Sequence, residues 1–351
     1  MPALFFSPVL TNGGIVIHNK GHEMENTGNP IRTLRVAAVQ VESQPGRIAA
    51  NHAHALPFIK EAVADGAQLV VLPELFACGY VPNADIWRYG ETINGPTVSW
   101  LRSTSQRYGI FLGAGLLEIE NDDFFNSFAL TSPGGELLGC ARKTRAEVYC
   151  FRYGAGRHVI RTDLGIMGIG ICADNHFSDF PGAMHQSDVD LMLMPHGSPM
   201  PYKTSNVISE NDIVETVEKA LSVPGLYTDS LGIPAVFVNA VGTLQPMAGL
   251  LGKFITPETF RLRGFSRIVD SDGTVIARLG EEEGLIVGNI TLDPSRKTFR
   301  TPPDHGGWLH RGSWMTRNVL MPVDLAVGRL SYAVSRKRRR AARTSVAEKI
   351  L

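Results

Sequence analysis

The chain has 351 residues, of which 44% are hydrophobic and 19% are charged, so its composition favours a well-buried globule over a disordered chain. Its 34 basic and 34 acidic residues cancel to a formal net charge of zero, so no overall field favours a partner of one charge sign. We therefore expect neither a nucleic acid nor a membrane as a partner.

The first part of the chain predicts alternating strands and helices. Residues 1–32 show little periodicity and several Gly and Asn, and we interpret them as an appended arm. Residues 34–41 predict a strand, 48–65 a helix with many alanines, and 68–72 a second, buried strand. The order strand, helix, strand favours α/β layering with buried strands.

Two hairpins and several single strands follow. The first hairpin joins 125–130 to 136–141 through Pro133-Gly134-Gly135, and the second joins 267–269 to 274–277 through Asp272-Gly273. Glycine supplies the positive φ that such tight turns need. Further strands are predicted at 166–171, 191–194, 235–238 and 285–290.

The pattern changes after residue 294. Residues 295–318 are polar and predict an extended excursion, and Pro322 then opens a predicted helix. The helix places four apolar residues on one face, which indicates that it docks by that face: Val323, Val327, Leu330 and Val334. We interpret the basic run 336–340 as a solvated tail rather than a nucleic-acid or membrane patch, because no aromatic residues interleave it.

The cysteines and residues 1–10 indicate the cellular compartment of the protein. The chain has four cysteines: Cys78, Cys140, Cys150 and Cys172. Three of them lie in or beside apolar runs, which suits reduced, buried thiols better than a disulfide framework. No run is long and apolar enough to span a bilayer, and residues 1–10 resemble no signal peptide. We therefore expect a cytoplasmic protein.

Three apolar runs end at a reactive side chain: Glu74, Lys143 and Cys172. A free thiol is mostly protonated at neutral pH, so it needs a base or a nearby cation before it can attack. A glutamate can take that proton and return it to a departing amine. A lysine favours the thiolate and, with the backbone N–H of Ala173, can donate to the oxyanion on a substrate carbonyl. The three residues predict a cysteine hydrolase that uses no histidine.

Each of these residues also has a purely structural interpretation. A lone cysteine at a strand end is usually buried packing, Glu74 after a proline can begin a turn, and Lys143 lies in a basic stretch typical of a solvated edge. A Cys–His hydrolase with His176 or His196 as the base stays open as a minor alternative.

The chain resembles the nitrilase, or carbon–nitrogen hydrolase, superfamily over about residues 33–293. The resemblance rests on a glutamate motif, a lysine motif, a nucleophile motif with its next strand, and a late hairpin, at residues 72–80, 142–144, 170–175 with 190–195, and 264–273. The spacings of 69 residues (143 − 74) and 29 residues (172 − 143) between the three reactive positions also suit that family. We therefore divide the chain into an N-terminal extension, 1–32, a carbon–nitrogen hydrolase domain, 33–293, and a C-terminal extension, 294–351.

The resemblance implies a fold, a mechanism and an assembly. The fold is an α/β four-layer α-β-β-α sandwich with mixed sheets. The resemblance makes Cys172 the nucleophile, Glu74 the general base and acid, and Lys143 the oxyanion stabiliser, with no metal or organic cofactor. Members of the family usually dimerise through a helical face, so we expect a homodimer or a higher homo-oligomer.

The chain departs from the family pattern after the lysine. The family places a second glutamate seven or eight residues on, where this chain has Cys150 and Phe151. Glu147 is the only nearby acid; it either replaces that glutamate or is a plain surface residue, and both interpretations stay open. The residue after the nucleophile is Ala173, where nitrile-specific members carry Trp, which favours amides over nitriles.

Six residues are candidates for substrate binding, and packing is an equal alternative for each: Tyr80, Tyr149, Ala173, Asn175, His176 and His196. If Tyr149, Phe151 and His176 face the ligand, the pocket suits an acyl group of modest size better than a charged amino acid. A metal site is disfavoured, because the sequence has no His-Glu-x-x-His and no paired Cys-x-x-Cys motif.

The sequence therefore predicts an enzyme that hydrolyses a non-peptide C–N bond in a small linear amide through a cysteine thioester. Two alternatives stay open: a nitrile or N-carbamoyl hydrolase of the same family, and a catalytically lapsed member that acts as an interaction protein. The missing second glutamate and the long extensions are the features that suggest a lapsed member.

Overall fold

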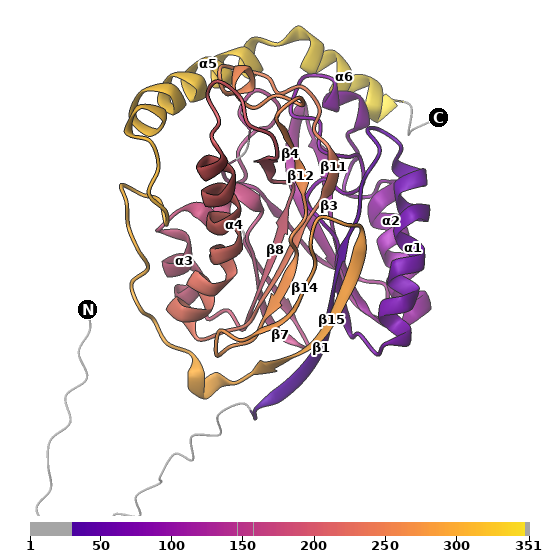
Figure 1. Ribbon diagram of the computed structural model, residues 1–351. Helices are drawn as coiled ribbons and strands as arrows, with labels where there is room; N and C mark the ends of the chain where they lie inside the picture. The colour runs from indigo at the N-terminus through magenta and orange to yellow at the C-terminus, as the bar shows by residue number, and fades with distance from the viewer. Residues whose placement is uncertain (1–29, 146, 157, 348–351) are drawn as a thin grey trace, which may run out of the picture.

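Two six-stranded sheets face each other and carry helices on their outer faces (Figure 1). The computed structural model describes residues 30–145, 147–156 and 158–347. The predicted arm at 1–32 therefore lies outside the described residues, apart from its last three positions. The division into a domain with two extensions stays a prediction.

The first sheet has the strand order β15-β1-β2-β3-β4-β5 and the second has the order β14-β13-β10-β8-β7-β6. The strands of the first sheet are β1 (Arg32–Gln40), β2 (Leu69–Val71), β3 (Phe111–Glu120), β4 (Asp123–Thr131), β5 (Leu137–Arg142) and β15 (Gly284–Leu292). The strands of the second are β6 (Val159–Thr162), β7 (Gly165–Ile169), β8 (Leu191–His196), β10 (Ala235–Asn239), β13 (Arg267–Val269) and β14 (Val275–Arg278). A small third sheet joins β9 (Pro199–Pro201), β11 (Val241–Thr243) and β12 (Phe260–Arg263).

Four helices cover the two outer faces. Helices α1 (Ile48–Ala64) and α2 (Pro96–Tyr108) lie on the first sheet, and α3 (Phe180–Gln186) and α4 (Glu210–Leu231) lie on the second. Sequence signals set these helix ends: Pro96 begins α2, a Ser209–Asp212 capping box begins α4, and left-handed Gly232 ends it. Short helical turns are η1 (Ile86–Tyr89), η2 (Cys172–His176), η3 (Leu251–Lys253), η4 (Pro294–Arg296) and η5 (Thr316–Leu320).

The main core lies between the two sheets, where β-branched and leucine side chains such as Val36, Ile169 and Leu193 are fully buried. This arrangement confirms the predicted α-β-β-α sandwich with mixed sheets. It also confirms the two predicted hairpins, β4–β5 and β13–β14. Strand β2 is parallel to β1 and β3, and β7 is parallel to β8, so loops that carry functional residues gather where these strands end.

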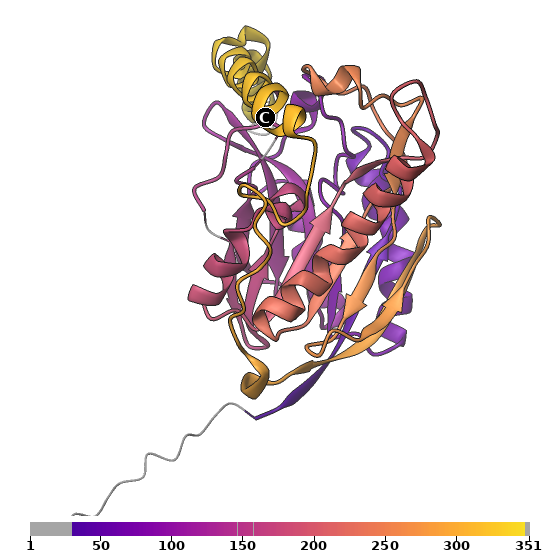
Figure 2. The ribbon, with the colours of Figure 1, turned by 60° about the vertical axis from the view of Figure 1, so that its left-hand side comes forward.

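The chain after residue 294 returns across one end of the sandwich (Figure 2). It forms α5 (Met321–Val334), which η5 precedes, and then α6 (Arg336–Ala347). The predicted docking face of α5 is wrong, because its four apolar residues are 47–66% exposed: Val323, Val327, Leu330 and Val334. The face that docks instead carries Asp324, Gly328 and Tyr332.

The basic run is not a freely solvated tail. Within α6, Lys337 forms an ion pair with Asp85 (3.0 Å), and the buried Arg338 pairs with Asp123. All four cysteines are unpaired thiols, as expected. Within the described ranges, no helix has the length and hydropathy needed to cross a membrane.

Candidate active site

Glu74, Lys143 and Cys172 come together at the edge where β2, β5 and β7 end. The ammonium Nζ of Lys143 donates to Glu74 Oε1 at 2.7 Å, and both side chains are fully buried. The charges of both residues act on the thiol of Cys172. Two sheets therefore deliver a carboxylate, an ammonium and a thiol to one point, as the three strand-end runs in the sequence predicted.

Both oxygens of the Glu74 carboxylate are held by donors. Oε1 accepts from Lys143 Nζ and from Asn126 Nδ2 (2.7 Å), and Oε2 accepts from the backbone N–H of Gly197 (2.7 Å). Gly115 on β3 lets this segment pass, since a Cβ there would lie 2.3 Å from the backbone nitrogen of Leu75. The carboxylate is thus fixed in one orientation before any substrate arrives.

Burial raises the pKa of Glu74 above its ordinary value, and the charge of Glu147 adds to the shift, although Lys143 and Asn126 oppose it. A carboxyl group with a raised pKa takes up a proton readily and can later give it away. This is the property that a single residue needs if it is to act first as a general base and then as a general acid.

Glu147 is the second carboxylate of the site. Lys143 Nζ donates to Glu147 Oε1 at 3.0 Å, with Oε2 at 3.2 Å, and the hydroxyl of Tyr80 donates to Oε1 at 2.9 Å. The structure therefore brings Glu147 to the lysine, although it stands four residues along the chain rather than at positions 150 or 151.

Two carboxylates keep Lys143 charged in a buried place. Burial alone lowers the pKa of Lys143, but the charges of Glu147 and Glu74 and the hydrogen bond to Glu74 outweigh burial and raise it well above its ordinary value. An ammonium has three N–H donors, and three carboxylate oxygens lie within hydrogen-bond distance of Nζ. The longest of these contacts, to Glu147 Oε2 at 3.2 Å, is the one that another oxygen would most easily replace.

Cys172 lies at the start of η2 in a left-handed backbone conformation, with φ of +46°. A non-glycine residue in that region is strained by about 1–2 kcal/mol, and such strain recurs where a functional side chain must be aimed. Burial and the charge of Glu74 raise the pKa of the thiol to about 12, although Lys143 lowers it. The resting sulfur is therefore a thiol, so Lys143 alone does not produce the thiolate that sequence reasoning expected from it.

A chain of hydrogen bonds that the sequence did not predict leads to the sulfur. Asn175 Nδ2 donates to His196 Nε2 (2.9 Å), so the ring proton lies on Nδ1. Nδ1 then donates to Ser198 Oγ (3.0 Å), and the Ser198 hydroxyl forms a hydrogen bond with Cys172 Sγ, 3.3 Å away, in which either atom can donate. Burial lowers the pKa of His196 well below its ordinary value, so the ring orients Ser198 and is a weak base. This disfavours the Cys–His alternative.

Asp174, two residues after the nucleophile, fixes the loop that follows Lys143. Its Oδ1 accepts from the backbone N–H groups of Thr144 (3.1 Å) and Arg145 (3.0 Å) and from the Thr144 hydroxyl (2.8 Å). The nucleophile turn and the lysine loop thus hold each other in place. An aspartate inside the nucleophile motif was the only sequence signal for this role.

A cavity of about 460 Å³ opens above Cys172. Three of the six candidate binding residues line it: Tyr80, Tyr149 and Ala173. The other three lie behind its wall. Asn175 and His196 are buried in the hydrogen-bond chain, and the His176 ring lies 5.9 Å from that of His196. Phe151 does not line this cavity either, and is buried in a hydrophobic cluster that also contains Tyr80 and Tyr149.

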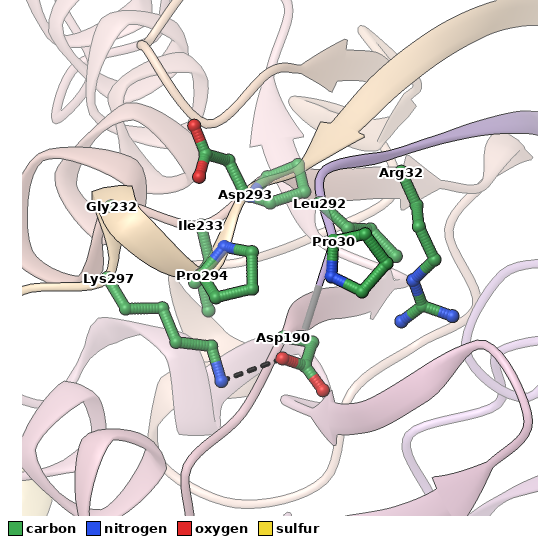
Figure 3. Close-up of a pocket in the computed structure, with 10 residues that line it drawn as sticks. Pro30, Arg32, Asp190, Gly232, Ile233, Leu292, Asp293, Pro294 and Lys297 are labelled. Atoms are coloured by element: carbon green, nitrogen blue, oxygen red, sulfur yellow. Dashed lines mark ion pairs between the residues drawn. The ribbon is translucent and has the colours of Figure 1, made fainter. Parts of the chain in front are cut away.

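A second hollow lies at the opposite end of the sheets, near the start of β1 and the end of β15 (Figure 3). Lys297 and Asp190 form an ion pair of 2.7 Å across it. Its volume of about 10 Å³ holds at most one water molecule. Within the described ranges, no three His, Cys, Asp or Glu side chains are grouped so as to hold a metal ion.

Comparison with known proteins gives a consistent result. The family model described as carbon-nitrogen hydrolase matches residues 35–299. A nitrilase of Pyrococcus abyssi is 33% identical over 178 residues, which cover 48% of this chain and 67% of the relative. The omega-amidase NIT2 of Danio rerio is 24% identical over 272 residues, which cover 74% and 88%. The crystal structure of a carbon-nitrogen hydrolase from Helicobacter pylori G27 has the same fold, with a TM-score of 0.65 at 19% identity, covering 74% and 90%.

Proposed function

The chain belongs to the carbon–nitrogen hydrolase family, and on that premise we propose that it hydrolyses a small linear amide through a thioester on Cys172. The observation that carries the proposal is the buried ammonium of Lys143, held between Glu74 Oε1 (2.7 Å) and Glu147 Oε1 (3.0 Å) beside the thiol. A buried charge needs such partners, and a substrate oxygen would replace the longest of them, the contact to Glu147 Oε2 at 3.2 Å.

In the first step the sulfur attacks the carbonyl carbon. Because the thiol has a pKa of about 12, it must lose its proton as the C–S bond forms, and Glu74 receives that proton. The carbonyl electron pair moves onto oxygen. Lys143 Nζ and the backbone N–H of Ala173 stabilise the oxyanion, and Glu147 and Glu74 keep the ammonium in position.

In the second step the C–N bond breaks. The oxyanion electrons re-form the carbonyl, Glu74 gives its proton to the departing nitrogen, and ammonia or an amine leaves. The raised pKa of Glu74 supports this return of the proton. Water then attacks the thioester, its proton passes to Glu74, the C–S bond breaks, and the sulfur regains a proton as the acid leaves.

The test compares an amide, a nitrile and an N-carbamoyl amine of matched chain length. Wild-type protein should release ammonia from the amide, and intact mass spectrometry should detect an acyl adduct on Cys172. Cys172→Ala should lose both signals, and Glu74→Gln should lose ammonia release. If no compound yields either an adduct or ammonia, the proposal fails.

The same substrate test distinguishes an amidase from a nitrile or N-carbamoyl hydrolase and from a catalytically lapsed member. Ala173 follows the nucleophile, which supports amides over nitriles, while the nitrilase and omega-amidase relatives keep both compound classes in the test. A catalytically lapsed member would show ordinary reactivity of Cys172 toward iodoacetamide. Alkylation near neutral pH that is faster than a thiol of pKa about 12 allows, and that Glu74→Gln slows, would instead support catalysis with Glu74 as the base.

We propose a homodimer or a higher homo-oligomer and a cytoplasmic location, on the strength of the family resemblance and of the four free thiols. Light scattering on the purified full chain tests the assembly, and a single species of monomer mass would refute it. Fractionation of the source cells tests the location.

A further inference from the structure

We propose that the cavity above Cys172 binds the acyl part of an amide with an uncharged hydrocarbon chain or ring, and that the C-terminal extension forms one of its walls. The inference rests on the proposed amide hydrolysis and adds its substrate class.

Size and lining both point to an apolar acyl group. The volume of about 460 Å³ lies in the range that holds drug-sized ligands, well beyond what an acetyl group fills. Most of the lining is apolar or aromatic and comes from several separate segments, among them those of Pro82, Val148, Met247 and Leu325. An apolar lining offers water few hydrogen-bond partners, so the cavity favours a hydrocarbon chain as its occupant.

Four charged residues also line the cavity, and two of them form ion pairs with other side chains of the protein: Arg145, Glu147, Arg317 and Asp324. Arg145 donates twice to Asp179, at 2.6 and 2.9 Å, and lies over the Phe177 ring. Glu147 accepts from Lys143. A charged group on a substrate would compete with these partners for either side chain.

The other two charged residues hold the wall itself. The Arg317 guanidinium donates to the backbone carbonyls of His305 and His310 and lies over the Trp308 ring. Asp324 Oδ1 accepts from the backbone N–H of Leu250 and from the Tyr149 hydroxyl. Their polar groups are thus used to dock the extension rather than to select a charged substrate.

The wall is anchored firmly enough to shape the cavity. Gly328 lets α5 approach closely, because a Cβ there would lie 2.5 Å from Val148 Cγ2. One turn further on, the hydroxyl of Tyr332 accepts from the backbone N–H of Phe124 (2.9 Å). Beside the anchor at Asp324, the first turns of α5 place Met321, Pro322 and Leu325 in the lining of the cavity.

All of these wall residues lie beyond residue 299, where the match to the family ends. The catalytic groups come from the matched part of the chain, and this wall comes from the extension. The extension therefore acts on the choice of substrate and leaves the chemistry to the matched residues.

Three amides with chains of six heavy atoms test the inference: hexanamide, glutaramate and 5-aminopentanamide, which end in a methyl group, a carboxylate and an ammonium. We expect kcat/KM for hexanamide to exceed both others by at least about tenfold, because each charged side chain of the lining already has a partner in the protein. From propanamide upward, each added methylene should raise kcat/KM by about fourfold until the cavity is filled. A preference for glutaramate or for 5-aminopentanamide would overturn the inference.

A matched pair of variants tests the wall. Leu325→Ala removes a lining side chain of α5 and should lower kcat/KM for hexanamide about fivefold to tenfold while propanamide changes less than about twofold. Leu330→Ala changes the exposed face of the same helix and should leave both substrates unaffected. Equal losses in the two variants, or none in Leu325→Ala, would remove α5 from the pocket.

Binding without turnover separates this inference from the proposed function. Calorimetry on Cys172→Ala measures the Kd of each six-atom amide directly. If hexanamide binds most tightly while the wild type releases no ammonia, the pocket inference stands and the hydrolysis proposal falls. If ammonia is released from all three amides at similar rates and they bind equally, hydrolysis stands and the inference falls.

Discussion

Replacing Glu147 with glutamine tests whether this residue serves as the second carboxylate of the site. The substitution keeps the shape of the side chain and removes its charge. In the wild type, Glu147 accepts from Lys143 Nζ at 3.0 Å and from the Tyr80 hydroxyl at 2.9 Å. Glutamine still offers one oxygen to these donors, so Lys143 loses the charge of a partner rather than all contact with it.

The expected loss follows from the kind of interaction removed. A hydrogen bond between charged groups contributes about 1.5–3 kcal/mol, and the buried Lys143 is not screened by water. If that energy positions the ammonium in the transition state, kcat/KM for an amide should fall about tenfold to about a hundredfold. Lys143 keeps Glu74 as a partner, so the protein should remain folded.

The pH dependence gives a second readout. Burial is the main cause of the raised pKa of Glu74, and the charge of Glu147 raises it further. Glu147→Gln removes the second contribution, so the pKa of Glu74 should fall. The basic form of Glu74 then persists to lower pH, and the acid limb of the kcat/KM profile should move to lower pH.

The assay is steady-state ammonia release across a pH series, with the fraction of active sites determined by alkylation of Cys172. The control is Glu215→Gln, which breaks another Lys–Glu pair of 3.0 Å and i,i+4 spacing, on the exposed surface of α4. Exposed pairs of this kind contribute about 0.3–0.5 kcal/mol to stability and should not affect catalysis. Wild-type kcat/KM and an unmoved acid limb in Glu147→Gln would refute the role of Glu147.

Further predictions concern the thiol and α5. Ser198→Ala should cut kcat about tenfold, with little change in KM, because its hydroxyl lowers the pKa of Cys172; unchanged kcat would exclude the hydrogen-bond chain from catalysis. Since the pKa of Cys172 is about 12, its alkylation by iodoacetamide should keep accelerating between about pH 8 and about pH 10; a plateau near the ordinary thiol pKa would contradict the burial argument. Gly328→Ala should destabilise the protein by about 1–3 kcal/mol in urea unfolding, because its Cβ would lie 2.5 Å from Val148 Cγ2. The control Gly225→Ala meets no atom within 4 Å and should instead stabilise α4 by about 0.5–1 kcal/mol; similar effects of both would rule out close packing of α5.

The layered core and the meeting of the reactive residues could be predicted because they follow from local patterns. Buried apolar runs of four to eight residues identify strands, and the ends of parallel strands share an edge. Glu74 and Cys172 each follow such a run, so their convergence needed no knowledge of side-chain contacts. Family motifs then assigned the order of the three reactive positions.

The position of Glu147 depended on a loop, and loops are not determined by periodicity. Its carboxylate reaches Lys143 because the backbone turns at 147–151, where the N–H groups of Cys150 and Phe151 both bond to the carbonyl of Glu147. Ser198 was missed for a related reason. A serine just past the end of β8 has no sequence signal until the turn that aims it at the sulfur is known.

For helix α5, the stripe of apolar residues did not identify the face that docks on the rest of the protein. The stripe predicted one face as the docked face, but that face is exposed, and α5 docks instead through a glycine and two polar side chains, Asp324 and Tyr332. A close backbone approach and buried hydrogen bonds stabilise this contact, and neither appears in a hydrophobic pattern. The pocket wall on the same helix was unpredictable for the same reason.

The division of labour between residues 35–299 and the wall after residue 299 affects how this protein should be compared with others. Related chains can share the thiol, ammonium and carboxylates while carrying unrelated C-terminal segments. Sequence identity over the family-matched residues then indicates a shared mechanism but does not predict the preferred substrate. If the wall selects the acyl group, exchanging the segment after residue 299 between two such chains should change the preferred substrate and leave the catalytic residues unchanged.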